Sequence, residues 1–329
     1  MSVRTRKLLM VAYRVLLIAL VALILGSFVV DRLGEAPYPR IWLGLGAALV
    51  VVIVLLRSGM KSLRPDANRP PVEVLAPVTG RWTALNSPAD KVPSHGTHGY
   101  GQTYAIDIVA EPEPGDGPAR PGFAWVWPPV RRSDAFPAYG APLLAVADGT
   151  VVHASDNQRD HLSRNSLPML AYLLLIESTL REMGGAGRIV GNHIILDLGD
   201  GTYAMYAHVR QGSLQVRAGD RVRAGQEIAS CGNSGNSTEP HVHFQLMDTP
   251  DLDTARGVPF TWRGIGVPSN GETFMAEGVR TVNAALHDDV ARVRRLEAAE
   301  RLAARGARGE FDAAAAHDAA KRARRQAFE

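Results

Sequence analysis

Two apolar runs near the N-terminus limit most strongly what this chain can fold into. Residues 15–30 and residues 41–56 each form a stretch of sixteen positions without a charged side chain. Sixteen residues of α-helix rise about 24 Å, whereas the hydrocarbon core of a bilayer is about 30 Å thick. The first run extends back to residue 8 if the Arg14 side chain snorkels, and the flanking Tyr38, Trp42, Arg40 and Arg57 suit the interfacial layers. We therefore expect a two-helix transmembrane hairpin within residues 1–69, with spans at about 8–30 and 41–56.

Two other interpretations of these runs are weaker. A cleavable signal peptide would explain the first run, with Arg4, Arg6 and Lys7 as its basic segment, but it leaves the second run unexplained. Buried helices of a soluble protein would rarely lack polar residues in two consecutive segments. The hairpin explains both runs.

The basic charge of the chain belongs to this segment. The formal net charge is +3 and the isoelectric point is near 9.1. Residues 1–69 contain ten Lys and Arg against three acidic residues, which is +7, so the other 260 residues carry −4. A nucleic-acid-binding groove needs basic residues in the folded part, so we expect no nucleic-acid partner. The single cysteine, Cys231, excludes an internal disulfide and leaves His, Asp and Glu as metal ligands.

From residue 70 onward the pattern is that of a β-rich domain. Residues 143–147, 149–153, 193–198 and 203–208 have strand-like composition with Gly- and Asp-containing turns between them, which indicates an antiparallel sheet. Residues 162–183 interrupt the pattern with one apolar helix, which we expect to be an insertion packed on the sheet. Residues 284–329 form an Ala- and Arg-rich helical tail.

Five histidines and one aspartate occur in patterns that suit metal chemistry. His241 and His243 stand two apart on a predicted strand, so their side chains project from one face. His208 ends another predicted strand. Asp107 lies among apolar residues after the histidine-bearing loop of His95 and His98, and a buried carboxylate needs a counter-charge. Two imidazoles, one carboxylate and a water make the open tetrahedral site of a catalytic zinc.

The order of these motifs resembles the lysostaphin/LytM-type zinc metallopeptidases over roughly residues 75–265. The resemblance rests on Ala145-x-x-Asp148-Gly149-x-Val151, Gly191-Asn192, Tyr206-Ala207-His208, the Gly219-to-Gln226 hairpin, Gly232-Asn233-Ser234-Gly235 and His241-Val242-His243-Phe244. It implies that residues 70–283 form a mainly β, antiparallel metallopeptidase domain with one Zn²⁺.

The resemblance also implies roles for individual residues. His95 or His98, with Asp107 and His243, would bind the zinc, and His208 and His241 would be catalytic. The first ligand departs from the usual pattern, because Thr103 stands four residues before Asp107 where the family has histidine. We favour His95, within a Ser-His pair that precedes Tyr-Ala-Ile-Asp, and keep His98 as the alternative.

The function implied is that of a membrane-anchored zinc metalloendopeptidase that hydrolyses peptide bonds in bacterial cell-wall peptidoglycan. The alternative is a catalytically silent LytM-type binding module that regulates a partner cell-wall hydrolase. We therefore expect a multi-pass protein of the cell membrane. The implied function places the peptidase domain on the extracytoplasmic side, whereas the basic residues flanking the two spans favour the cytoplasmic side. The expected partners are a peptidoglycan peptide and the lipid bilayer.

Overall fold

A computed structural model describes residues 2–32, 39–66, 68–113, 115, 117–277, 296–297 and 300–301. The chain divides into two units, Met1–Ala276 and Glu277–Glu329. The predicted helical tail, residues 284–329, lies almost entirely outside the described residues.

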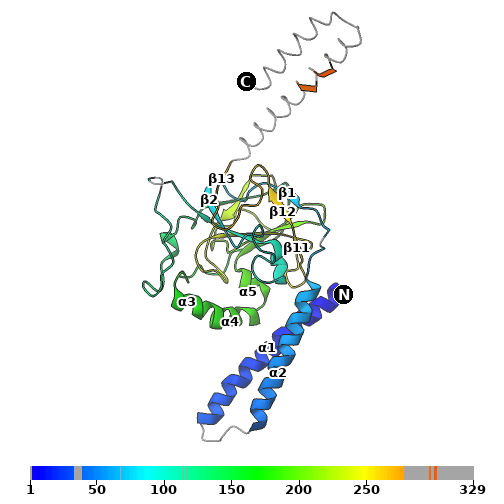
Figure 1. The fold of residues 1–329 in the computed structure, drawn as a ribbon, viewed down its shortest axis with the longest axis vertical. Helices are drawn as coiled ribbons and strands as arrows, with labels where there is room; N and C mark the ends of the chain where they lie inside the picture. The colour runs from blue at the N-terminus through cyan, green and yellow to red at the C-terminus, as the bar shows by residue number, and fades with distance from the viewer. Residues whose placement is uncertain are drawn as a thin grey trace, which may run out of the picture. The chain divides into compact units, whose positions relative to one another are not determined.

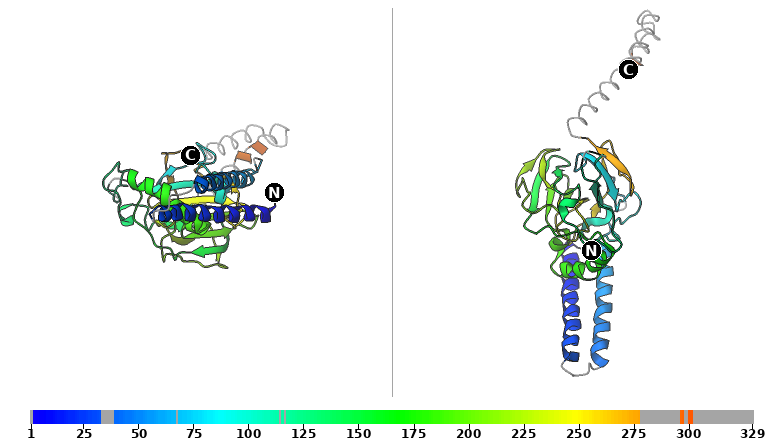
Figure 2. Two further views of the ribbon diagram at one scale, coloured as in Figure 1. Left: turned by 90° about the horizontal axis from the view of Figure 1, so that it is seen from below. Right: turned by 90° about the vertical axis from the view of Figure 1, so that its left-hand side faces the viewer.

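The two apolar runs lie in two long helices, α1 (Val3–Arg32) and α2 (Pro39–Ser62). They lie side by side and extend away from the β-rich part of the same unit (Figures 1 and 2). Among the described residues one helix, Val3–Val29, is long and apolar enough to cross a membrane, and the apolar part of α2, Leu43–Gly59, is shorter. By length and apolar composition, the described residues thus contain one helix that could span a bilayer, where the sequence led us to expect two.

The start of α1 is attached to the β-rich part. Arg6 donates from Nη1 to the carbonyl oxygen of Thr254 at 2.9 Å, and Met10 is buried. Arg14 forms a bidentate pair with Asp253 at 2.9 and 2.5 Å. Residues 6–14 of α1 therefore contact the β-rich part. The apolar part of the helix that extends beyond the β-rich part begins at about residue 15.

The β-rich part is built on one nine-stranded sheet, and all the strand pairs in it are antiparallel, as the sequence predicts. Its order is β13-β2-β3-β10-β7-β6-β5-β8, with β11 beside β10. The strands are β2 (Gly80–Leu85), β3 (Ile106–Ala110), β5 (Gly149–Ser155), β6 (His193–Asp197), β7 (Tyr203–Ala207), β8 (Arg221–Val222), β10 (Val242–Met247), β11 (Gly257–Val258) and β13 (Thr273–Ala276).

Two smaller pairs complete the β structure. β4 (Pro142–Leu144) pairs antiparallel with β9 (Glu227–Ser230), and β1 (Val72–Val74) pairs parallel with β12 (Phe260–Trp262). Two short 3₁₀ turns, η1 (Gly99–Tyr104) and η2 (Ser133–Ala135), lie in the connecting loops.

Strand β10 separates two buried environments. Phe244 packs on one face against Phe260, with ring centroids 5.1 Å apart, in the main apolar core that also holds Trp262. The opposite face meets a second cluster that includes Met205 and Tyr100. Because side chains alternate along a strand, the polar residues of β10 all lie on this second face.

The inserted segment contains a helix that is nearly continuous, made of α3 (Leu167–Tyr172), a π-helical turn η3 (Leu173–Glu177) and α4 (Ser178–Met183), followed by α5 (Ala186–Val190). It begins at Leu167 rather than at residue 162. The residues before it are held extended, because Ser163 and Arg164 donate backbone hydrogen bonds to Arg131 and Thr238. Ser166 then caps the helix by accepting from the Met169 amide.

Candidate metal centre

The register of the central strands brings the predicted site residues together. On β10, His243 lies opposite Asp107 of β3 on one side and opposite Ala207 of β7 on the other. His208 directly follows Ala207, and His241 stands two residues before His243. The site is therefore built at the middle of the sheet, where Asp107 and His243 lie on strands that are paired on both sides.

Asp107 is the centre of the group. Its carboxylate oxygens lie 3.0 Å from His95 Nε2, 2.9 Å from His243 Nδ1 and 3.4 Å from His241 Nε2. Two sets of side chains have ligand atoms within 4.8 Å of one another and could hold a metal ion: His95 with Asp107 and His243, and His208 with His241 and His243.

The loop that contains His95 and His98 directs the two side chains to different partners. Ser94 donates from Oγ to the Ala105 carbonyl oxygen at 2.6 Å, which folds the loop against the start of β3 and turns His95 towards Asp107. His98 instead hydrogen-bonds through Nδ1 with Thr103 Oγ1 at 2.9 Å, and within the described part of the chain it belongs to neither metal-type group.

Three imidazoles of the two metal-type groups, His95, His208 and His241, use Nδ1 for local hydrogen bonds. His208 Nδ1 lies 2.8 Å from the Ser234 carbonyl oxygen, and His241 Nδ1 lies 2.7 Å from the Glu239 carbonyl oxygen. Since a carbonyl oxygen only accepts, these nitrogens carry the proton. His95 Nδ1 lies 3.0 Å from Ser94 Oγ, whose own proton is donated to Ala105. In the neutral form, each Nε2 therefore presents a lone pair.

His243 has the opposite arrangement because of Gln245. The Gln245 amide donates from Nε2 to the Tyr100 carbonyl oxygen at 2.7 Å, so its Oε1 accepts from His243 Nε2 at 3.0 Å. Nδ1 of a neutral His243 then has a lone pair facing an Asp107 carboxylate oxygen. Three imidazoles thus face the Asp107 carboxylate, and His208 lies beside two of them, which is a donor set that fits a bound cation.

Burial and the mutual charges of these residues shift their pKa values. Burial by itself would raise the pKa of Asp107, but the neighbouring His95 and His241 hold it well below its usual range. Burial lowers the pKa of His208 far below its usual value, and burial also lowers that of His243 despite Asp107. Burial alone would lower the pKa of His241, but the charge of Asp107 together with the hydrogen bonds to Asp107 and to the Glu239 backbone raises it.

The group opens into a pocket of about 400 Å³ lined on one side by these residues and on the other by Leu170, Leu173 and Leu174 of the insertion. Three residues other than glycine have positive φ in the described part of the chain, namely Asn86 (48°), Tyr100 (57°) and His208 (59°), and all three line this pocket. Such conformations cost free energy and often mark functional sites.

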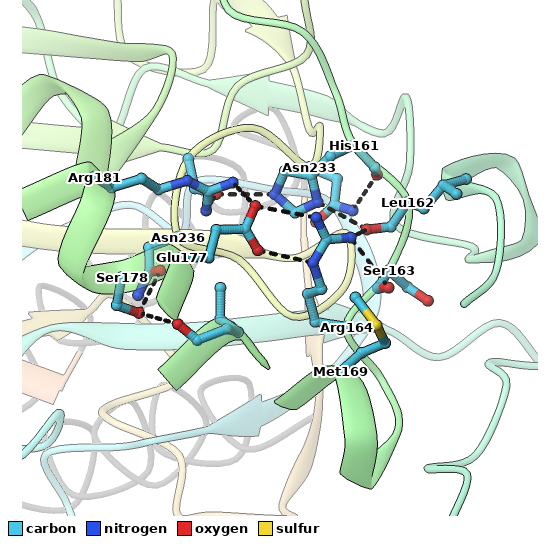
Figure 3. A network of polar contacts seen from close by, with 12 residues as sticks. His161, Leu162, Ser163, Arg164, Met169, Glu177, Ser178, Arg181, Asn233 and Asn236 are labelled. Atoms are coloured by element: carbon cyan, nitrogen blue, oxygen red, sulfur yellow. Dashed lines mark hydrogen bonds and ion pairs between the residues drawn. The ribbon is translucent and has the colours of Figure 1, made fainter. Parts of the chain in front are cut away.

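The insertion also supports the loop that holds His208. Glu177 pairs with Arg164 at 2.9 Å and with Arg181 at 2.7 Å, and Arg181 in turn donates to the Gly235 carbonyl oxygen (Figure 3). Gly235 follows Ser234, the acceptor of the His208 proton. The ion-paired network therefore connects the inserted helix to the backbone that orients His208.

Three further histidines of the described residues, His153, His161 and His193, lie outside both metal-type groups. His153 stacks on His193 with ring centroids 4.3 Å apart, and burial lowers the pKa of His193 to about 4. His161 hydrogen-bonds through Nε2 with the Gly235 carbonyl oxygen. Cys231 is buried beside this loop, and burial raises the pKa of its thiol.

The sequence analysis missed the polar residues around the group. Asn86 donates from Nδ2 to Asp107 at 2.8 Å, and Gln245 and Ser234 accept from His243 and His208. Gln245 was detectable, because it stands two residues after His243 on the same strand and therefore on the same face. Asn86 and Ser234 carry no such local pattern.

The fold and the site together define a β-sheet domain with a buried His and Asp group of the metal-binding type. A family model described as "Peptidase family M23" matches residues 176–254. Residues 176–254 of the chain therefore match the peptidase M23 family, to which the lysostaphin/LytM-type resemblance of the sequence also points. The matched residues include His208, His241 and His243, whereas His95 and Asp107 lie before them.

Curated relatives agree over short segments. The chain is 33% identical to "Glycyl-glycine endopeptidase ALE-1" from Staphylococcus capitis over 115 residues, which is 35% of this chain and 23% of that protein. It is 39% identical to "Lysostaphin" from Staphylococcus simulans over 74 residues, which is 22% of this chain and 14% of that one. The chain thus spans less than a quarter of the length of these relatives.

A solved structure is similar as well. The catalytic domain of lysostaphin from Staphylococcus simulans has a TM-score of 0.26 and 23% sequence identity, over 47% of this chain and 74% of that one.

Proposed function

We propose that the protein is a membrane-anchored zinc metalloendopeptidase. His95, Asp107 and His243 hold one zinc ion, and His208 and His241 act on the substrate. The observation that carries this proposal is that the ligand atoms of His95, Asp107 and His243 lie within 4.8 Å of one another, because two imidazoles and a carboxylate are the ligand set of an open catalytic zinc site.

His208 and His241, which are not zinc ligands in this proposal, have different roles towards the substrate. Zinc, when bound, acts as a Lewis acid on the scissile carbonyl and makes water more acidic. His208 is held neutral by burial and fixed through Nδ1, so its Nε2 accepts a proton from the attacking water. His241 is fixed through Nδ1 by the Glu239 carbonyl oxygen and has its Nε2 3.4 Å from Asp107, so it lies where a protonated imidazole would stabilise the developing oxyanion.

We propose peptide bonds of bacterial cell-wall peptidoglycan as the substrate. The support comes from the names of relatives, since one is a glycyl-glycine endopeptidase and another, 33% identical over 57 residues, is "Peptidoglycan DD-endopeptidase ShyA" from Vibrio cholerae.

The anchor in this proposal is the α1–α2 hairpin, so the protein is a multi-pass protein of the cell membrane. Residues 70–283 form the peptidase domain on the outer side. Digestion of intact cells with an external protease tests the sidedness, and a fully protected domain would contradict a peptidoglycan substrate.

Metal content and cleavage test the chemistry together. His243→Ala should lose stoichiometric zinc, measured by elemental analysis, and should lose release of peptides from purified peptidoglycan. His153→Ala, which changes an exposed imidazole on the same sheet, should retain both. Full activity of His243→Ala would refute the assignment, and a wild-type protein without metal or cleavage would instead indicate the silent binding module.

A further inference from the structure

The inserted helix has its charges turned inward and its apolar side chains turned outward. Between residues 167 and 180 the one charged side chain, Glu177, is held against Arg164 and Arg181. The exposed side chains of this stretch are apolar or aromatic, namely Leu167 (48%), Tyr172 (39%), Leu174 (60%), Leu175 (76%), Ile176 (50%) and Leu180 (54%). Contiguous apolar surface of this kind marks an interaction site.

A second apolar segment lies directly beside the first. Residues 123–127 expose Phe123 (47%), Trp125 (74%), Val126 (68%) and Trp127 (82%). The backbone joins this aromatic loop to the helix start, because the Leu167 amide donates to the Ala124 carbonyl oxygen at 3.0 Å. Tryptophan at the edge of an apolar surface is typical of the interface between membrane and water.

The patch lies at the end of the domain from which the hairpin leaves. In Figures 1 and 2, α3 and α4 lie at the edge of the β-rich part beside α1. Arg14 lies within 3.4 Å of Glu182 in α4 while pairing with Asp253. The free apolar part of α1 begins at the next residue, so α4 lies level with the start of the proposed span.

The length of the apolar part of α1 also indicates that the domain lies close against the bilayer. Between Arg14 and Asp31 the apolar part of α1 rises about 24 Å, which is some 6 Å less than a hydrocarbon core of about 30 Å. The side chain of Arg14 is 13% exposed and tied to the domain, so it is not free to snorkel away from it. If the exposed apolar residues of 123–127 and 167–180 enter the bilayer by about 5–10 Å, the usual depth of an interfacial helix, they fill the part of the hydrocarbon core that α1 is too short to cross.

We propose that the membrane patch, defined as residues 123–127 together with the exposed residues of 167–180, lies in the interfacial layer of the lipid bilayer that holds α1 and α2. This inference rests on the proposed membrane anchor. Leu170, Leu173 and Leu174 line the histidine pocket, so the patch also places that pocket close to the membrane surface. Substrate close to the bilayer is then within reach of the site.

Fluorescent probes at single cysteines test this arrangement in the full chain. Cys231→Ala removes the one natural cysteine, and an environment-sensitive fluorophore is attached at Leu175→Cys or Val126→Cys in the patch. Val50→Cys on α2 reports insertion of the anchor, and Val152→Cys on β5 is the matched domain control (exposures of 59% and 38%). Each variant is reconstituted into phosphatidylcholine vesicles with and without nitroxide-labelled lipid.

We expect the nitroxide lipid to quench the probes at residues 175, 126 and 50 by at least half and to leave the probe at 152 unchanged. Quenching at residue 50 without quenching at 175 and 126 overturns the patch and leaves the anchor intact. No quenching at residue 50 refutes the anchor itself. A signal at 175 that follows the protein-to-lipid ratio instead of the nitroxide indicates a second copy on the patch and overturns the proposal.

Discussion

At the scale of single residues, the site depends on which nitrogen of His243 faces Asp107. Gln245 decides this, since its amide donates to Tyr100 and leaves only its oxygen for His243. Partners that orient a metal-binding imidazole typically contribute 10- to 100-fold to metal affinity.

Replacing Gln245 with leucine should therefore weaken zinc binding by about 10- to 100-fold. The expected reason is that Nε2 of His243 loses its acceptor, so the ring is no longer held with Nδ1 towards Asp107. Competition with a chromophoric chelator measures the affinity. Gln215→Leu, at an exposed glutamine paired with Glu227, is the matched control, and equal affinities of the two variants would contradict the role of Gln245.

At the scale of elements, the inserted helix is held to the sheet by charge as well as by packing. The side chains of Arg164, Glu177 and Arg181 are 11%, 15% and 17% exposed, and one carboxylate serves both guanidinium groups. Removal of that carboxylate leaves two largely buried cations without their partner, which is costly.

Glu177→Gln should lower the free energy of unfolding by about 2 to 3 kcal/mol, measured by denaturation in detergent micelles. Although burial opposes it, Arg164 and Arg181 lower the folded-state pKa of Glu177. Its stabilisation is thus present above the ordinary carboxyl pKa and is lost as the pH falls through the lowered one. The difference between the two proteins should narrow below about pH 4.

Asp134→Asn provides the control for this measurement. Asp134 also pairs with an arginine, Arg132, but the two side chains are 56% and 80% exposed, so water screens the pair. We expect no measurable loss of stability from this change. A similar loss in both variants would mean that the buried network contributes nothing specific.

The strands of the sheet were predictable from sequence, because alternation and turn residues are local signals. The strands predicted at 193–198 and 203–208 are found at 193–197 and 203–207, and His243 lies on the strand 242–247 that the His-x-His pattern indicated. The start of the inserted helix was placed five residues too early, since the extended residues 162–166 are fixed by bonds to Arg131 and Thr238, which are distant in sequence. The choice between His95 and His98 likewise depended on a loop whose anchor is Ala105.

At the scale of the whole molecule, the N-terminal helix and the histidine site are joined by a continuous series of hydrogen bonds. Arg14 contacts Glu182, and Tyr100 donates from its hydroxyl to the same carboxylate. The Tyr100 carbonyl oxygen accepts from Gln245, which in turn holds His243. Tyr100 also has a positive φ of 57°, so its position depends on these contacts.

Arg14→Gln should therefore affect the site, although Arg14 touches none of its histidines. Loss of the pair with Glu182 should loosen residues 99–104, seen as faster amide hydrogen exchange, and should weaken zinc binding by about five-fold, or about 1 kcal/mol. Lys7→Gln is the matched control, because Lys7 lies on the same helix and pairs with Asp251 but is 56% exposed. If Arg14→Gln leaves exchange in 99–104 and zinc affinity at the values of Lys7→Gln, the helix serves as an anchor alone. If both change together, the attachment of the domain to its N-terminal helix is part of what holds His243 in place.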